Sequence, residues 1–315
     1  MAKILSIQSH VAFGHVGNAA VTFPLQVLGH EVWPVPTAVL SNHAGYPDTG
    51  GARLDPALID DVLTGLDARG APAACDVLLT GYLGSAETGA VVGHHVARLR
   101  TANPRLLYCC DPVMGDRDSG FYVEDGLVRH FKEKATPAAD VLTPNLFELE
   151  LLAGRPECGL HGATAVEIAT AAREVAAGMR PGARVMVTSV EASDVPTEHM
   201  TMMAVDAAGA WLVQTPRLAF TKNPHGAGDL ASALFAVALA EGHSPEQSLS
   251  DMASRLFAVL NVAAETDSPE LDLVGARANL CHPPQRFDAH PILFSSHCYR
   301  HRHPSPSHFY FCKSW

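Results

Sequence analysis

The sequence predicts an α/β fold, in which a mainly parallel central sheet carries helices on both faces. Short β-rich runs alternate along the chain with longer helical patterns, and this alternation is typical of parallel strands joined by helices. The 315 residues are 47% hydrophobic and 17% charged, which is the composition of a globular protein that can bury its own core.

Eight segments have the composition of strands. In chain order these are residues 3–8, 31–35, 77–80, 106–110, 141–143, 184–188, 200–205 and 210–214. The last two follow each other closely, so we expect them to form an antiparallel hairpin beside the parallel strands.

Seven further segments have a helical pattern. They are residues 17–28, 56–69, 86–101, 146–153, 165–177, 229–241 and 245–264. No internal repeat and no linker interrupts these elements, so we expect a single domain over residues 1–282.

From Pro283 the chain is rich in His, Pro, Ser, Cys and aromatic residues, with neither helical nor strand periodicity. We expect residues 283–315 to be an irregular, poorly ordered C-terminal extension. Four of its side chains have the chemistry of transition-metal ligands, although a solvated tail is the interpretation that we favour. These are His297, Cys298, His301 and His303.

The charge and the cysteines limit the class of function. A formal net charge of −11 argues against a nucleic-acid-binding surface, because phosphate contacts need clustered Lys and Arg. No run approaches the ~18–20 apolar residues of a membrane-spanning helix, and the first apolar run is too short for a signal peptide. None of the seven cysteines forms a CxxC pair, so we expect reduced thiols and a cytoplasmic location.

The strongest local motif is NPHGAGD at residues 223–229, followed by an apolar, Ala-rich run. Two glycines before Asp229 predict a compact turn at a helix N-terminus. Free amides and the helix dipole at such a turn stabilise a phosphate or a developing negative charge. An ordinary glycine turn with Asp229 as the N-cap would give the same pattern.

Polar residues also follow two predicted strands. Asp111 comes directly after one strand and Thr143 ends another, and ligands of open α/β sheets bind at this carboxyl edge. Mg²⁺ on a nucleotide prefers oxygen ligands. The candidates are Asp111, Asp116, Asn145 and Glu148. A helix cap or a surface carboxylate is the alternative for each, and it is the interpretation that we prefer for Glu150.

Weaker signals surround the same edge. Thr188 and Ser189 end a further strand with hydroxyls that suit phosphate. Loops carrying His10, His15 and His43 should rise over this edge as a substrate lid, although loop histidines more often pack or hydrogen-bond than catalyse. The chain has no GxxxxGK[ST], GxGxxG or GxSxG motif and no protein-kinase signature. Their absence argues against a P-loop enzyme, a Rossmann dehydrogenase and a hydrolase.

Taken together, several motifs resemble those of pyridoxal kinases. They are QSHV at 8–11, GHVGN at 14–18, TFPLQVLG at 22–29, SNH at 41–43, TGYLGS at 80–85, DPVMGD at 111–116 and TPN at 143–145. The resemblance extends from residue 3 to about residue 265. It implies a ribokinase-like three-layer sandwich, usually a homodimer, that phosphorylates the 5′-hydroxymethyl group of pyridoxal-type vitamers with ATP. It also implies Mg²⁺ and, in many members, a response to K⁺.

The resemblance also implies roles for individual residues. Asp229 would be the catalytic base, beside an anion hole formed by Gly226, Ala227 and Gly228. Besides Asp229, the residues expected to contact the pyridine substrate are Ser9, His43, Ala44, Gly45 and Tyr82. The residues expected around ATP are Asp111, Asp116, Thr143, Asn145, Glu148, Thr188, Ser189, Thr215, Pro216, Arg217 and Leu218. Of these, Asp111 and Glu148 would hold Mg²⁺, partly through water.

Two other functions fit the sequence. One is a kinase of the same fold for another alcohol, such as hydroxymethylpyrimidine or a sugar. The other is a non-catalytic protein that binds a B6 vitamer. The intact Asp229 and the glycine turn before it argue against the second, because a reservoir protein needs no base.

The chain departs from the family pattern at Ala44, where members commonly carry threonine. Ala44→Thr restores a hydroxyl toward the substrate, and a neutral hydrogen bond contributes roughly 0.5–1.5 kcal/mol. We therefore expect the KM for pyridoxal to fall roughly 2- to 12-fold, with kcat nearly unchanged, in steady-state kinetics at saturating ATP. An unchanged or higher KM would mean that the loop has repacked, or that a water replaces the hydroxyl.

Overall fold

The structure, a computed structural model, describes residues 1–155 and 159–294. Within these residues the strands are β1 (Lys3–Val11), β2 (Glu31–Leu40), β3 (Gly51–Arg53), β4 (Val77–Thr80), β5 (Leu107–Cys110), β6 (Gly115–Asp116), β7 (Gly120–Phe121), β8 (Val141–Leu142), β9 (Arg184–Val187), β10 (His199–Val205), β11 (Ala210–Pro216) and β12 (His290–Pro291). All eight predicted strands are present. The strands β3, β6, β7 and β12 were not predicted, because two or three residues are too few to show periodicity.

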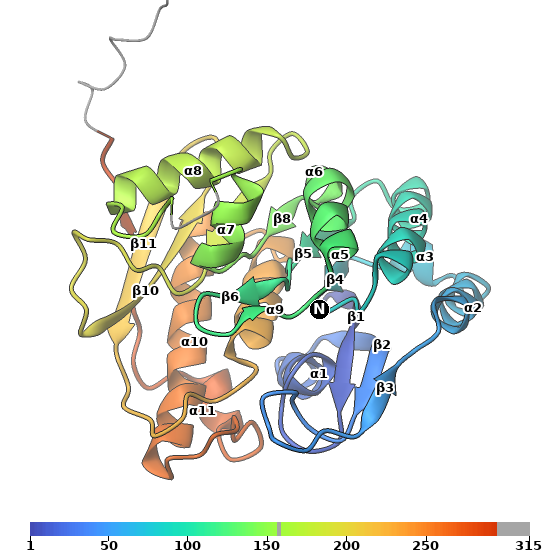
Figure 1. Ribbon diagram of the computed structural model, residues 1–315, viewed down its shortest axis with the longest axis horizontal. Coiled ribbons are helices and arrows are strands. Elements are labelled where there is room, and N and C mark those ends of the chain that lie inside the picture. The colour runs from blue at the N-terminus through green and yellow to red at the C-terminus, as the bar shows by residue number, and fades with distance from the viewer. Residues whose placement is uncertain (156–158, 295–315) are drawn as a thin grey trace, which may run out of the picture.

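The main sheet has the strand order β12-β11-β10-β9-β8-β5-β4-β1-β2-β3 (Figure 1). Its central strands, from β9 to β2, pair in parallel. Strands β10, β11 and β12 at one end and β3 at the other pair antiparallel. The mainly parallel sheet and the β10–β11 hairpin are therefore confirmed.

The described helices are α1 (Asn18–Val27), α2 (Pro56–Asp67), α3 (Ala71–Ala74), α4 (Ala86–Ala102), α5 (Asp125–His130), α6 (Thr136–Ala138), α7 (Leu146–Leu152), α8 (Ala165–Ala177), α9 (Ala227–Ala240), α10 (Pro245–Glu265) and α11 (Arg277–Cys281). A π-helical turn at Phe131–Ala135 joins α5 to α6. The seven predicted helices are all present. The short helices α3, α5, α6 and α11 were missed, because each spans fewer than two turns.

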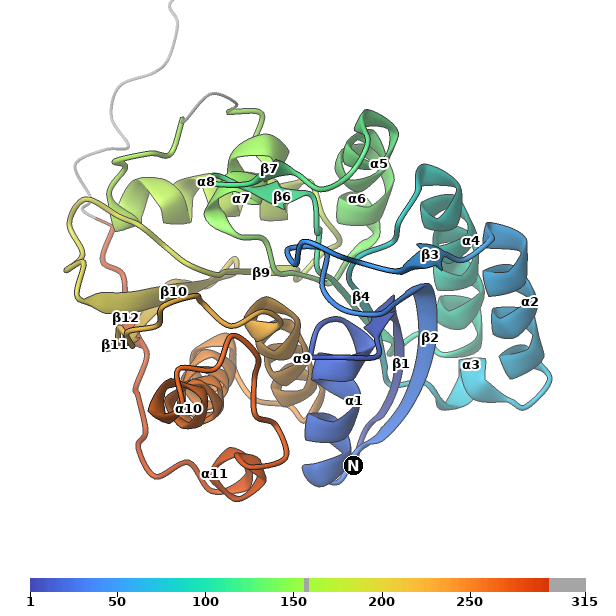
Figure 2. The ribbon, with the colours of Figure 1, turned by 60° about the horizontal axis from the view of Figure 1, so that its bottom comes forward.

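Helices cover both faces of the sheet, which makes a three-layer sandwich (Figure 2). One face packs on α2, α4, α7 and α8, and the other on α1, α9, α10 and α11. Neighbouring strand residues enter opposite cores, as alternation requires. Leu78 lies in the first core and Leu79 in the second. The adjacent Cys110 and Cys109 divide in the same way, and both are free thiols.

Helix α9 is the most deeply buried helix of the second layer. Every residue from Leu230 to Leu239 is buried, because the helix lies between β4 and β5 of the sheet and its neighbours α1 and α10. Burial on all sides explains why this run is apolar without a polar face. It also fixes the direction of the helix, whose N-terminus points to the carboxyl edge of the parallel strands.

The segment after Pro283 differs in part from the prediction. The sequence predicted no regular structure there, which is wrong for β12, since His290 and Pro291 pair with β11. The amides of Phe287 and Ala289 also donate to serine hydroxyls of α10, at 3.0 and 2.9 Å. Residues 295–315, with the four candidate metal ligands of the tail, lie outside the described residues, so the boundary at 282 stays a prediction.

Within the described residues, no helix is long and apolar enough to span a membrane.

Candidate active site

The parallel strands end side by side at one edge of the sheet. The residues that directly follow these strands still form backbone hydrogen bonds at or just beyond the ends of the neighbouring strands. The amide of Asp111 donates to the carbonyl of Thr80 at 2.8 Å, and the amide of Thr143 donates to Cys110 at 3.1 Å. The amide of Thr188 extends this row after the next strand, donating to Pro144 at 3.0 Å. These bonds place the predicted residues Asp111, Thr143 and Thr188 along one edge, as expected for an α/β ligand site.

The glycine turn lies over this edge at the start of α9. Gly226 is the N-cap, with a left-handed φ of 85°, and a Cβ there would collide with the carbonyl oxygen of His15. The alternative interpretation, an ordinary glycine turn capped by Asp229, does not hold, because Asp229 Oδ2 instead accepts the amide of Gly17 at 2.9 Å. Amides in the first turn of a helix have no acceptor within the helix. Here they belong to Ala227, Gly228 and Asp229.

One turn into α9, Ser232 joins the helix to the strand ends. Its hydroxyl donates to Asp111 Oδ2 at 2.9 Å and lies 2.8 Å from Thr143 Oγ1. Ser232 and Asp229 are three residues apart, so both project from the same helix face. The sequence contained that spacing, but Ser232 was not singled out.

Glu148 and Asn145 form a capping box at the start of α7. Glu148 Oε2 accepts the amide of Asn145 at 2.9 Å, and its Oε1 accepts the amide of Met114 at 2.8 Å. The Asn145 side chain donates to the carbonyl of Gly115 at 2.8 Å. Asp116, in the same turn, accepts the amide of Ser119 at 2.6 Å. The contacts of Glu148 with Met114 and of Asn145 with Gly115 hold the start of the β6–β7 hairpin against the N-terminus of α7.

Three carboxyl groups at the site have raised pKa values. Burial, together with the nearby Glu148 and Asp229, holds the pKa of Asp111 well above its ordinary value. Burial raises the pKa of Glu148 to about 7, although backbone amides oppose this. Burial raises the pKa of Asp229 to about 6, against the opposing effect of the Gly17 amide. Close carboxylates repel one another, so the site favours a bound cation.

The residues present fit a divalent cation that is only partly coordinated by protein. Asp111 and Glu148 are buried carboxylates that interact electrostatically, and hard cations take such oxygens. Among the described residues, no group of three or more His, Cys, Asp or Glu side chains forms a complete metal site. Water and nucleotide phosphates would therefore have to supply other ligands, as they commonly do for Mg²⁺.

Glu150 is neither a cap nor a surface carboxylate, which corrects the prediction. Its side chain is buried and accepts from Arg117 at 2.8 and 2.9 Å and from the amide of Leu160 at 2.9 Å. A buried carboxylate needs such partners to offset its lost hydration. The sequence could not reveal them, because Arg117 is 33 residues away along the chain.

The loop at residues 41–50, here called the lid loop, packs on the segment before α9. The ring of His43 stacks on His225, with 3.9 Å between centroids. Burial and His225 lower the pKa of His43 to about 4, so the ring is neutral near pH 7 and accepts the amide of Gly45 at 3.1 Å. Lys222 lies 4.8 Å from the ring of Tyr46. Ala44 is exposed on this loop.

The other predicted substrate contacts approach the same region from the sheet. Ser9 is buried near the end of β1, and Gly17, whose amide holds Asp229, packs against its backbone. Tyr82 follows β4 and is half-buried, and its carbonyl accepts the hydroxyl of Thr37 at 2.6 Å. The structure therefore brings Ser9 close to Asp229 through Gly17.

Residues 215–218 reach the same edge from the antiparallel strands. In the register, Val187 of β9 pairs with Met203, and Pro216 of β11 pairs with His199 at the start of β10. The end of β11 therefore lies beyond the carboxyl end of β9. The four residues are Thr215, Pro216, Arg217 and Leu218. Nearby, Ser189 is exposed and has a left-handed φ of 51°, a strained conformation that is common at functional sites.

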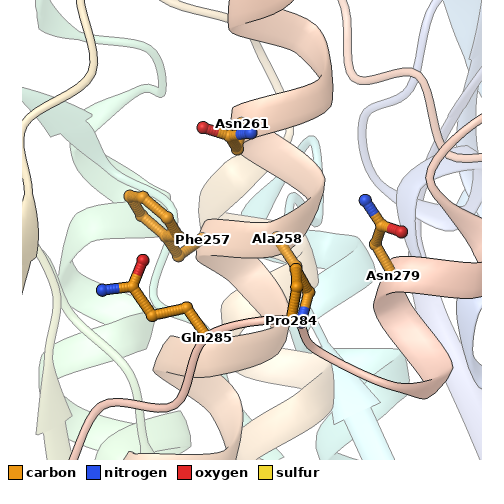
Figure 3. Close-up of a pocket in the computed structure, with 6 residues that line it drawn as sticks. All are labelled: Phe257, Ala258, Asn261, Asn279, Pro284 and Gln285. Carbon is orange, nitrogen blue, oxygen red and sulfur yellow. The ribbon is translucent and has the colours of Figure 1, made fainter.

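A cavity of about 270 Å³ lies elsewhere, along α10 (Figure 3). It is lined by Phe257, Ala258, Asn261, Asn279, Pro284 and Gln285. None of these side chains carries a charge, and none belongs to the predicted site. The carboxyl edge of the sheet, rather than this cavity, is the candidate active site.

Relatives of known function share most of the chain. Pyridoxal kinase PdxY of Rubrobacter xylanophilus is 47% identical over 286 residues, which cover 90% of this chain and 96% of that protein. Pyridoxal kinase PdxY of Corynebacterium diphtheriae is 41% identical, over 92% of this chain and 99% of that protein. The chain belongs to the pyridoxal kinase family. It is therefore an enzyme, a kinase.

Family models and solved structures agree with this membership. The model described as phosphomethylpyrimidine kinase matches residues 51–261. Pyridoxal kinase from Leishmania donovani, solved with ADP and pyridoxamine, has a TM-score of 0.81 at 28% identity, over 93% of this chain and all (100%) of that chain. A putative phosphomethylpyrimidine kinase from Bacteroides thetaiotaomicron has a TM-score of 0.81 at 25% identity, over 92% of this chain and 98% of that chain. The predicted ribokinase-like fold is confirmed.

The glycine turn can be tested with a matched pair of variants on α9. Gly226 and Gly242 flank this helix, and both have a positive φ, of 85° and 92°. A Cβ at Gly226 meets the His15 carbonyl, whereas a Cβ at Gly242 meets nothing within 4 Å. Gly226→Ala should therefore lower kcat by about 100-fold, since a shift of about 1 Å in the turn costs that much. Gly242→Ala should lose some thermal stability at unchanged kcat, and equal kcat in the two variants would contradict this role.

Proposed function

We propose that the chain transfers the γ-phosphoryl group of ATP to the 5′-hydroxymethyl group of pyridoxal, and also of pyridoxine and pyridoxamine. The observation that carries the proposal is the position of Asp229, a carboxylate held by the Gly17 amide beside the free amides of the α9 turn. The names of the relatives support the vitamer as acceptor, and the Leishmania enzyme was solved with ADP and pyridoxamine.

Asp229 acts as the general base. With a pKa of about 6 it is ionised at neutral pH and still basic enough to take a proton. As the vitamer oxygen attacks the γ-phosphorus, its proton passes to the Asp229 carboxylate. A new O–P bond forms, and the bond between the γ-phosphorus and the bridging oxygen breaks, releasing ADP. The amides of Ala227 and Gly228 stabilise the charge on the transferred group.

The pyridine ring of the vitamer lies between the sheet edge and the lid loop. Ser9 and Tyr82 contact it from the strand side, and His43, Ala44 and Gly45 cover it. Neutral His43 suits this position, because it can accept or donate a hydrogen bond without adding charge. The stack of His43 on His225 connects the lid loop to the glycine turn, because His225 directly precedes Gly226.

ATP lies along the row of strand ends. Its expected contacts are Asp111, Asp116, Thr143, Asn145, Glu148, Thr188, Ser189, Thr215, Pro216, Arg217 and Leu218. Asp111 and Glu148 would hold Mg²⁺, partly through water, and the cation would supply positive charge that neutralises the phosphates. We further propose K⁺ as an activating ion, a homodimer as the assembled state, and a cytoplasmic location. The free, buried thiols of Cys75, Cys109 and Cys110 are compatible with a reducing compartment.

Hydroxymethylpyrimidine is the second candidate acceptor, because the matching family model is a phosphomethylpyrimidine kinase. ADP formation should be measured with pyridoxal, pyridoxine, pyridoxamine, hydroxymethylpyrimidine and ribose. We expect the highest kcat/KM with pyridoxal. A higher kcat/KM with hydroxymethylpyrimidine would make that alcohol the acceptor instead of pyridoxal. No ADP formation with any of these alcohols would indicate a non-catalytic vitamer-binding protein.

The base assignment predicts the effect of Asp229→Asn. The amide cannot accept a proton, so kcat should fall by ~10²–10⁴-fold while the affinity for ATP stays nearly unchanged. In the wild type, kcat/KM should fall as the pH drops below about 6, because protonation removes the base. Rates across pH and ATP binding by calorimetry measure both effects. If Asp229→Asn keeps more than about a tenth of the wild-type kcat, the side chain contributes no general-base catalysis and the base assignment is wrong.

A further inference from the structure

The carboxylate of Glu270 joins two loops that border the site and that follow the neighbouring strands β1 and β2. Its Oε1 accepts the hydroxyl of Tyr46, in the lid loop, at 2.8 Å. Its Oε2 accepts the amide of His15, in the loop between β1 and α1, at 2.9 Å. Tyr46 is 224 and His15 is 255 residues away from Glu270 along the chain. Nothing in the sequence around Glu270 pointed to a role at the site.

The loop held by Glu270 is the one that holds Asp229. The amide of Gly17, two residues after His15, donates to Asp229 Oδ2. The carbonyl of His15 packs against Gly226, at the point where a Cβ would not fit. A shift of the His15 backbone would therefore move both the donor to Asp229 and the wall of the glycine turn.

Glu270 is itself held in place by local contacts. Ser268 Oγ accepts the amide of Glu270 at 3.1 Å and donates to its carbonyl at 2.7 Å. The backbone beside it pairs with the segment before α9, where the amide of His225 donates to Pro269 at 3.3 Å. The same carboxylate raises the pKa of Tyr46, after the larger effect of burial. The side chain of Glu270 is thus a fixed acceptor that both loops share.

We propose that Glu270 is a positioning residue that couples closure of the lid loop to placement of Asp229. With the lid closed, the Tyr46 hydroxyl holds one carboxylate oxygen, which orients the other toward the amide of His15. With the lid open, the glutamate side chain regains rotational freedom and the loop before α1 loosens. Asp229 is then fully positioned only when the substrate is covered. This inference rests on the proposed function, since it assumes that Asp229 is the base.

Four variants test the coupling in steady-state assays with pyridoxal and ATP. Tyr46→Phe should raise the KM for pyridoxal about 10-fold, the loss expected for a hydrogen bond to a charged group, and should also lower kcat about 3- to 10-fold. Glu270→Ala should lower kcat about 10- to 100-fold. The double variant should be no worse than Glu270→Ala, because Tyr46 acts through Glu270. Glu270→Gln, whose amide can accept from His15 and donate to Tyr46, should stay within about 3-fold of wild type.

Asp272→Ala is the matched control for the segment. Its carboxylate also accepts an amide, that of Gly275 at 2.8 Å, but reaches neither loop of the site, so its kinetics should equal those of the wild type. Circular dichroism checks folding of each variant.

A wild-type kcat in Glu270→Ala, or additive losses in the double variant, would overturn the coupling. If Glu270→Ala does not fold, Tyr46→Phe decides, because a changed KM with unchanged kcat means that Tyr46 only fastens the lid. A wild-type enzyme inactive on pyridoxal would instead contradict the proposed function.

Discussion

The burial of α9 is the constraint on which the site depends. Its residues from Leu230 to Leu239 are enclosed by the sheet and two helices, so the helix cannot turn or slide without exposing a large apolar surface. Its first turn, with the free amides, is therefore fixed over the ends of β5 and β8. The Ser232 hydroxyl adds a polar contact to Asp111 and Thr143 at this point. Packing thus fixes the backbone of Asp229, and the amide of Gly17 orients its carboxylate.

The electrostatics of the site are unfavourable in the protein alone. Burial raises the pKa values of Asp111, Glu148 and Asp229, and repulsion by nearby carboxylates adds to this at Asp111 and Glu148. A bound cation would relieve this repulsion, and in the proposed mechanism the raised pKa of Asp229 suits it to accept a proton. The backbone amides that Glu148 accepts keep its carboxylate in place despite the unfavourable burial. The site is thus preorganised for charged ligands at some cost to stability.

The lid side of the site is built differently from the nucleotide side. On the proposed nucleotide side, the candidate residues Asp111, Thr143 and Thr188 follow strand ends that the sheet fixes. On the proposed vitamer side, a few side chains join the loops to distant segments, namely the stack of His43 on His225 and the two hydrogen bonds of Glu270. Few contacts and exposed backbone make such loops the elements that open most readily. In the proposed function, opening of the lid loop would admit the vitamer, whereas phosphoryl transfer would depend on the rigid sheet edge.

The sequence by itself determined the fold class, eight of the ten strands of the main sheet, the seven longest helices and the polar residues at the strand ends. It could do so because alternation, helix periodicity and glycine turns are local properties of the chain. Asp229 and the glycine turn were found in the same way. Only the tertiary structure decided that Gly226, rather than Asp229, caps α9, that Glu150 is buried against Arg117, and that β12 extends the sheet. It also decided the contacts of Glu270, because Tyr46 and His15 lie more than two hundred residues away along the chain and meet its carboxylate only when the sheet and α9 have packed.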